Sequence, residues 1–306
     1  MPASLRSIAS LLLGTVLTSA CSLRRLAVGG LADALSGSAA TFAREDDPEL
    51  VRGALPFVMK ALEAVLSERP EDEALLGAAS SAFGLYAYAF VQLDGEALES
   101  DDYARSEHLK ARALALYLRA RDYALRALEL RHPGLAAGLR TEPAETAAGL
   151  ARDDVEFAYL AGGTWGLAIS LGKDDPALLA DLEAVRALLR RALELDERHA
   201  EGALHEAMIP VEALPRAMGG SPERAREHYQ RALELSGGRR ASLHLKLAEN
   251  VSVPAQDRAE FEHLLQAALA VELDAAPDLR LSNRIAQGRA RQLLATIDDL
   301  FLPSLE

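Results

Sequence analysis

The side chains best suited to hold a small molecule are aromatic rings and one guanidinium in the middle of the chain. Aromatic faces bind apolar or ring-shaped ligands, and an inward-pointing arginine can hold a carboxylate through paired hydrogen bonds. We therefore name a candidate ligand cavity of six residues: Tyr86, Phe90, Tyr117, Arg121, Tyr159 and Trp165. Two alternatives remain open, namely that the rings pack as ordinary core and that Arg121 pairs with Asp122 or lies in solvent.

Residues that could catalyse a reaction or bind a metal form no complete motif. His205-Glu206 begins like the H-E-x-x-H zinc motif, but Ile209 stands where the second histidine is required. The glycine-rich run 162–166 is not followed by the Lys-Ser/Thr pair of a phosphate-binding loop. No G-x-S-x-G sequence occurs in the chain. We expect no catalytic residue, no metal and no cofactor.

The first 21 residues have the pattern of an export signal that ends in a lipid-attachment cysteine. Arg6 precedes an apolar segment, residues 8–17, that is too short to span a bilayer. The sequence Leu-Thr-Ser-Ala-Cys, which ends at Cys21, resembles the lipidation site of bacterial lipoproteins. A plain signal peptide, or a terminal helix with a buried cysteine, is the alternative. We expect a periplasmic protein anchored by lipid on Cys21, on the outer membrane rather than the inner one because Ser22 follows.

Composition and charge indicate an acidic, helical protein. The chain has 306 residues, of which 50% are hydrophobic and only 5% aromatic, and its formal net charge is −13. Alanine and leucine predominate, and both have high helix propensity. Nucleic-acid binding is excluded because it needs a basic surface to neutralise phosphates. We expect a signal peptide at 1–20, a lipidated N-terminus and tether at 21–45, and one compact all-α domain at 46–306.

A repeated helical pattern predicts the architecture of that domain. In residues 223–238, Ala225, Tyr229 and Ala232 fall on one face of a helix, as in the second helix of a tetratricopeptide repeat (TPR). Alanines in similar surroundings recur along the chain at Ala64, Ala127, Ala192, Ala232 and Ala268. We therefore expect a degenerate TPR-like array of helical hairpins without strands. The expected helices, about ten, lie near residues 50–68, 72–93, 104–131, 153–171, 177–195, 200–217, 222–236, 239–250, 257–272 and 279–300.

Several longer stretches together resemble the T-component family of TRAP transporter accessory lipoproteins. They include DDPELVRGALPFVMKALEAVL, LYLRARDYALRALELRHPG, TWGLAISLGKDDPALLADL, RALELDERHAEGALHE and RLSNRIAQGRARQLL. The resemblance runs from about residue 22 to residue 301. It implies an exported all-α protein with cryptic TPR-like repeats, associated with the periplasmic substrate-binding protein of a tripartite ATP-independent periplasmic transporter. It implies no catalytic residues.

Two functions therefore remain as expectations. The first is a lipid-anchored accessory of solute uptake that docks the periplasmic substrate-binding protein and holds a small organic or apolar ligand. The second is a TPR scaffold lipoprotein for envelope assembly that binds no ligand. A concave array of repeats suits either function, because neighbouring repeats expose a continuous surface. Association into a homo-oligomer is compatible with both.

Overall fold

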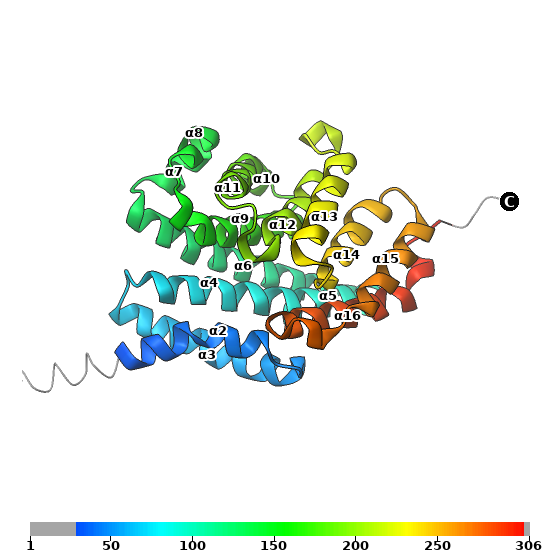
Figure 1. Cartoon of the computed structure of the whole chain (residues 1–306), viewed down its shortest axis with the longest axis horizontal. Helices are drawn as coiled ribbons and strands as arrows, with labels where there is room; N and C mark the ends of the chain where they lie inside the picture. Colours follow the sequence, from blue (N-terminus) through cyan, green and yellow to red (C-terminus); the bar gives the residue numbers. More distant parts are fainter. Residues whose placement is uncertain (1–28, 303–306) are drawn as a thin grey trace, which may run out of the picture.

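The computed structural model describes residues 29–302. Every regular secondary-structure element in that range is an α, 3-10 or π helix, and none is a strand (Figure 1). The expectation of an all-α protein is thus confirmed. Cys21 and the signal sequence lie outside the described residues. Residues 29–36 are helical, and Ala32 in this segment is 2% exposed and belongs to the main hydrophobic core.

The α-helices that follow are α2 (Ser38–Ala43), α3 (Pro48–Glu68), α4 (Glu73–Ala87), α5 (Leu93–Ala97), α6 (Tyr103–Arg131), α7 (Leu135–Thr141), α8 (Pro143–Ala148), α9 (Val155–Leu171), α10 (Pro176–Ala180), α11 (Leu182–Leu195), α12 (Ala203–Glu212), α13 (Pro222–Ser236), α14 (Ala241–Leu247), α15 (Arg258–Ala270) and α16 (Arg280–Ala295). Two π-helical segments, η1 (Tyr88–Gln92) and η5 (Ala248–Ser252), extend α4 and α14. Short 3-10 turns are η2 (Arg152–Asp154), η3 (His199–Glu201), η4 (Arg216–Met218), η6 (Leu273–Ala275), η7 (Pro277–Leu279) and η8 (Ile297–Asp299).

Local sequence signals explain where α13 begins and ends. The Ser221 side chain accepts a hydrogen bond from the Arg224 amide at 3.2 Å, and Pro222 occupies the first turn. Gly237 ends the helix in the left-handed region, at φ +59°, where a side chain would be strained. The observed bounds of α13 coincide with the predicted range 222–236.

Three predicted ranges differ from the observed elements. The helix expected at 72–93 continues through η1 into α5, because the chain changes to π geometry without breaking. The helix expected at 177–195 is divided at Asp181, which ends α10 and begins α11. The helix expected at 239–250 changes to π geometry at Ala248 and continues to Ser252.

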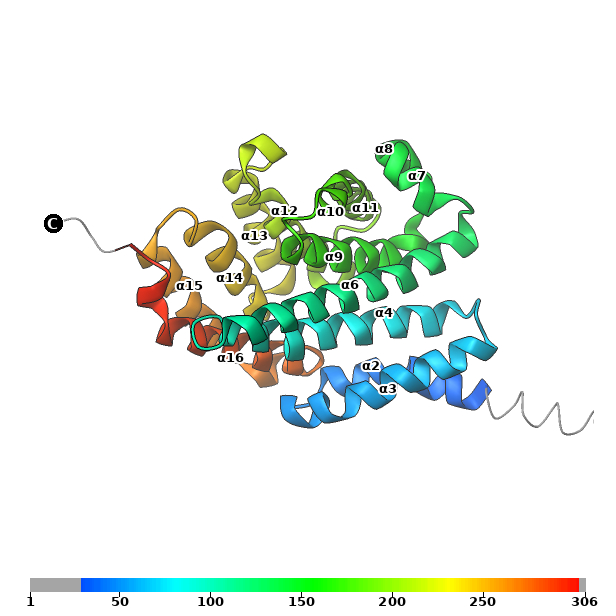
Figure 2. The ribbon, with the colours of Figure 1, turned by 180° about the vertical axis from the view of Figure 1, so that it is seen from behind.

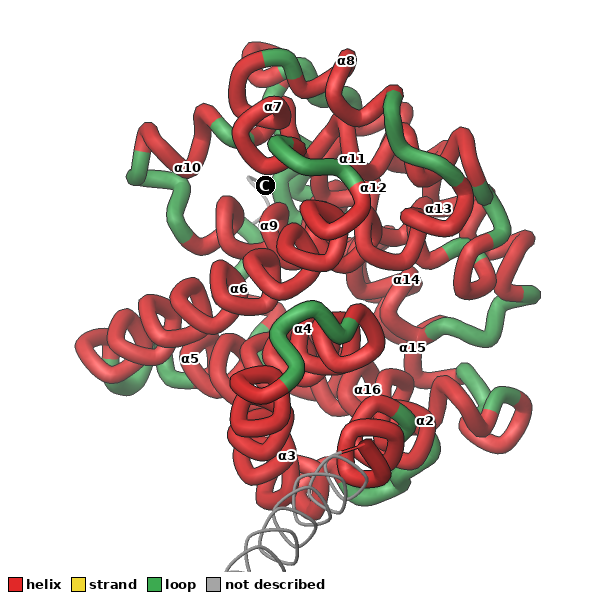
Figure 3. The backbone as a smooth tube through the Cα atoms, turned by 90° about the vertical axis from the view of Figure 1, so that its left-hand side faces the viewer, coloured by secondary structure: helices red, strands yellow, loops and turns green. Residues whose placement is uncertain are grey.

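Consecutive helices pack side by side and the array returns on itself. Helix α4 lies between α3 and α6, α6 packs on α9, and α9 packs on α11 (Figures 1 and 2). The chain continues through α12, α13, α14 and α15, each in contact with the next. The last long helix, α16, then contacts α2 and α3 at the beginning of the described chain (Figure 3). The detailed TPR-like geometry of these hairpins stays a prediction.

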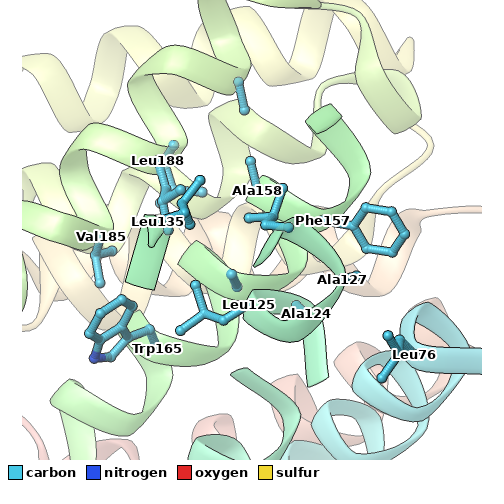
Figure 4. Close-up of a cluster of buried hydrophobic side chains, with 14 of the residues drawn as sticks. Leu76, Ala124, Leu125, Ala127, Leu135, Phe157, Ala158, Trp165, Val185 and Leu188 are labelled. Carbon is cyan, nitrogen blue, oxygen red and sulfur yellow. The ribbon is translucent and has the colours of Figure 1, made fainter. Parts of the chain in front are cut away.

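Two large hydrophobic clusters fill the array. The first lies among α3, α4, α6, α9 and α11, and Figure 4 shows part of it, with Trp165 near Val185 and Leu188. The second lies among α12 to α16 and includes Tyr229 and Phe261. Both draw on helices distant in sequence, so the domain is one packed body rather than a row of separate hairpins.

The continuous helical segment Glu73–Ala97 has a mean hydropathy of 1.5 and is long enough to cross a membrane. Half of its most apolar window is buried inside the protein, where α4 is covered by α3, α6 and α9. A core helix that is covered on several sides needs apolar residues all round. Burial therefore accounts for the apolar character of this segment.

The repeated alanines test the predicted helical register. Ala127, Ala192, Ala232 and Ala268 are each 0% exposed, as their proposed place in close helix contacts requires. Ala64 is exposed, so the register is wrong for α3. The reason is that α3 lies at the edge of the array (Figure 1) and buries only one face. Ala64 lies on the other face.

A pair of matched substitutions tests this register. We expect Ala232→Arg to lower the free energy of unfolding by about 3–5 kcal/mol, because it places an uncompensated charge in the core. Ala64→Arg adds the same side chain on a solvent-facing surface and should change the stability by less than about 0.5 kcal/mol. Denaturant unfolding followed by circular dichroism measures both values. Equal effects of the two substitutions would contradict the assignment of faces.

Candidate functional site

The two π-helical segments mark an unusual place in the fold. In η1 the amide of Leu93 bonds to the carbonyl of Tyr88, and in η5 the amide of Val253 bonds to the carbonyl of Ala248. Such wider turns are rare, and they occur frequently at functional sites. Both segments are linked to the same arginine, Arg289 of α16. Glu249 of η5 contacts it directly, and Gln92 of η1 reaches it through Glu96.

A chain of polar contacts connects these segments through the interior. The buried Tyr117 hydroxyl donates to Gln92 Oε1 at 2.6 Å, and Gln92 Nε2 donates to Glu96 Oε1 at 2.8 Å. The guanidinium of Arg289 contacts Glu96 Oε2 at 2.6 Å and donates to Glu249 Oε1 at 3.0 Å. Arg289 therefore bridges α5, near the start of the array, and η5, near its end. We call these five residues, Tyr117, Gln92, Glu96, Arg289 and Glu249, the closing cluster.

The charges of the closing cluster are strongly coupled. The side chain of Arg289 is only 11% exposed. Burial opposes its charge, but the carboxylates of Glu249 and Glu96 outweigh burial and raise the pKa of Arg289. Burial raises the pKa of Glu249 above the usual range of a glutamate, although Arg289 opposes the change. The positive charge of Arg289 is thus held by the two carboxylates beside it.

Tyr88 and Lys246 flank the closing cluster. Burial, and then the charges of Glu249 and Glu96, raise the pKa of the Tyr88 phenol far above its usual value. The Lys246 ammonium lies 5.2 Å from the centre of the Tyr88 ring, within range of a cation–π contact. The arrangement is suited to holding polar groups in fixed positions.

The structure distributes the six predicted cavity residues over four places. Tyr86 and Phe90 have ring centres 5.9 Å apart, and Tyr117 contributes to the closing cluster. The guanidinium of Arg121 lies 4.9 Å from the centre of the Trp165 ring and donates hydrogen bonds to Asp122. Its pairing with Asp122 was one of the alternatives left open by the sequence.

Trp165 and Tyr159 both lie on α9, but in different surroundings. Trp165 is 1% exposed within the main hydrophobic cluster, and its indole nitrogen is buried without a hydrogen-bond partner. The Tyr159 ring lies 5.5 Å from the ring of His199, and burial raises the pKa of its phenol to about 12. The ligand role of the six residues stays a prediction.

Sequence reasoning missed most of the closing cluster. Glu96, Glu249 and Arg289 are separated by up to 193 positions (289 − 96), and each resembles an ordinary surface residue in its local sequence. No sequence signal distinguishes the π segments from the α-helices that they extend. Tyr117 alone could be selected, because an aromatic residue in a helix rich in small residues already indicated an interior position.

His205, considered above as half of a zinc motif, has another role. Its Nδ1 lies 2.8 Å from His228 Nδ1, and its Nε2 lies 3.2 Å from Glu197 Oε1. Burial lowers the pKa of both histidines, and the pKa of His228 falls to about 4. Among residues 29–302, no group of three histidine, cysteine, aspartate or glutamate side chains could hold a metal ion. The pair instead joins α12 to α13.

Removal of the bridging cation tests the closing cluster. We expect Arg289→Gln to lower the free energy of unfolding by about 2–3 kcal/mol, because two half-buried carboxylates, 22% and 26% exposed, then lose their shared partner. Adding Glu249→Gln should restore part of that loss. The control is Arg258→Gln, whose side chain is 47% exposed and pairs with exposed acids, and it should cost less than about 1 kcal/mol. Equal costs for Arg289→Gln and Arg258→Gln in denaturant unfolding would contradict the bridging role.

Comparison with known proteins identifies the family. A family model described as TRAP transporter T-component matches residues 44–301, which include nearly all of the described helices. An uncharacterized protein of Treponema pallidum (strain Nichols) is 30% identical in sequence, over 94% of this chain and 95% of that protein. The match thus covers both ends of the array and the closing cluster between them. The chain belongs to the TRAP transporter T-component family.

Proposed function

We propose that this protein is a lipid-anchored periplasmic accessory of a TRAP uptake system that docks the periplasmic substrate-binding protein. Membership of the T-component family supports an accessory role in a TRAP transport system. Docking, the lipid anchor and a ligand held inside the array are the parts that we add. The observation that supports docking most directly is an exposed apolar face on α3.

The outer face of α3 has an apolar stripe. Leu50 and Phe57 are 60% and 77% exposed, and Ala54, Ala61 and Ala64 complete a helical row with the spacing i, i+4, i+7, i+11 and i+14. The opposite face of α3 is buried in the core. Exposed large apolar residues in such a row are typical of a protein-binding surface. We call these five residues the α3 stripe.

The composition of the α3 stripe fits a protein partner. Phe57 projects from its centre with alanines on both sides, so a partner side chain can approach the ring closely. A central aromatic anchor surrounded by small contacts is the usual arrangement at the energetic centre of an interface. Charged Glu49 and Lys60 lie beside the stripe and are exposed, which gives it a polar edge. In this family the periplasmic substrate-binding protein is the partner that we propose for this surface.

Capture of the substrate-binding protein encoded nearest to this one tests docking. We expect Phe57→Glu to weaken the complex by about 30-fold or more, the scale of a lost central anchor. Tyr103→Glu is the matched control, because Tyr103 is 65% exposed at the start of α6, away from the stripe. The affinities are measured by surface plasmon resonance with the full chain in detergent, against the ligand-free and ligand-loaded partner.

Three other outcomes of this experiment would overturn the proposal. Absence of a complex with either form of the partner would favour the scaffold function. Equal loss with Phe57→Glu and Tyr103→Glu would show that docking does not use the α3 stripe. If Phe57→Glu leaves binding intact but changes the mass of the assembly that this protein forms alone in solution, the stripe belongs to contacts between copies of this chain.

Replacement of the cysteine tests the lipid anchor. We expect Cys21→Ser to release the protein from membranes, because the thiol that would be acylated is removed and the chain has no second cysteine. Ser22→Ala, one residue further, should remain in the membrane fraction. Fractionation of cells grown with labelled fatty acid shows whether each variant is in the membrane fraction and whether it carries the acyl label. Membrane association of Cys21→Ser without acyl label would contradict lipid anchoring at this residue.

A further inference from the structure

A mostly apolar cavity lies at the seam where the array closes. Its walls come from α3, α4 and α16, and α2 covers it, so both ends of the described chain contribute to it. Figure 3 shows how the backbones of these four helices lie together. Its volume is about 170 Å³. Leu55, Leu62 and Leu281, each 1–2% exposed, form the deepest part of the wall. None of the six aromatic or arginine residues selected from the sequence lines this cavity.

The polar groups at the edge of the cavity are mostly engaged elsewhere. The Ser38 hydroxyl donates to the Leu35 carbonyl at 2.7 Å, and the Ser282 hydroxyl donates to the Leu279 carbonyl at 2.9 Å. Asp278 accepts a hydrogen bond from Arg44 at 2.6 Å. Ser81 supplies one further hydroxyl, and a single hydroxyl cannot replace the water around a charged group. The cavity therefore favours an uncharged, apolar occupant.

Helix α2 is a lightly attached cover. Its six residues include none that is buried, although Ala39, Phe42 and Ala43 line the cavity. The ion pair that follows it, Arg44 with Asp278, has side chains 64% and 70% exposed. Exposed ion pairs contribute little to stability. Displacement of α2 therefore costs little free energy compared with opening the core, which provides a route into the cavity.

We propose that this cavity binds a small uncharged apolar ligand, either a hydrocarbon ring or a short aliphatic segment. A dry engineered cavity of about 150 Å³ lined by Leu, Ile and Phe binds benzene, so this cavity has sufficient size and suitable walls. An occupant would contact α2 and α16 together and hold α2 against the seam. The site does not depend on docking, because none of the residues of α3 that line it, Leu55, Val58 and Leu62, belongs to the α3 stripe.

Titration with benzene tests the site in the full chain. We expect calorimetry to show binding to the wild-type protein and a rise in its melting temperature with benzene concentration. Ala82→Leu, in the wall, and Ala43→Leu, in the cover, fill the cavity and should abolish both signals. Ala40→Leu is the matched control, because Ala40 is an exposed residue of α2 that does not line the cavity, and it should bind benzene as the wild type does.

The measurement has clear contrary outcomes. Lack of binding to the wild type up to the solubility limit of benzene would overturn the proposal, as would unchanged binding by Ala82→Leu and Ala43→Leu. Benzoate has the same ring with a charge and should not bind; binding of benzoate as tightly as benzene would overturn the uncharged class. If Ala82→Leu fails to fold, Ala43→Leu alone decides the location, since it alters only the cover. Capture of the substrate-binding protein is a separate measurement, so each proposal can fail without the other.

Discussion

Arg289 of α16 joins two segments of the helical array that are distant in the sequence, α5 and η5. Arg289 is nearly removed from water and contacts Glu96 on one side and Glu249 on the other. A buried arginine without partners would be too costly, so α5, η5 and α16 are constrained to meet at one point. Hydrophobic packing brings the helices together, and this bridge adds a polar contact between segments that are far apart in the sequence.

Closure of the array creates the cavity that we propose as a ligand site. When α16 meets α2 and α3, it completes the walls of the cavity beneath α2. Two further ion pairs, Arg44 with Asp278 and Arg284 with Asp46, join the same ends but are much more exposed than the closing cluster. The seam thus combines a firmly fixed interior with a lightly attached edge. Such a gradient of local stability is common where proteins bind ligands.

Helix α3 is shared by the two binding roles that we propose. One face contributes to the core and to the cavity, and the other presents the α3 stripe to solvent. The docking that we propose gives a context for a helix with two apolar faces, since the α3 stripe would be covered in the complex. Local packing alone would not require Leu50 and Phe57 to be apolar, because they are mostly exposed.

Local signals in the sequence account for the positions of most helices, because caps, prolines, glycines and the apolar period act within a few residues. Helix α13 is an example, since it follows its signals from Ser221 to Gly237. The sequence also indicated the family and the buried alanines of the inner helices. Only the tertiary structure decided that Ala64 faces solvent, that Arg121 pairs with Asp122 beside Trp165, and that Glu96, Arg289 and Glu249 meet. Those outcomes depend on which helix lies at the edge and on how distant segments converge, and local periodicity contains no information about either.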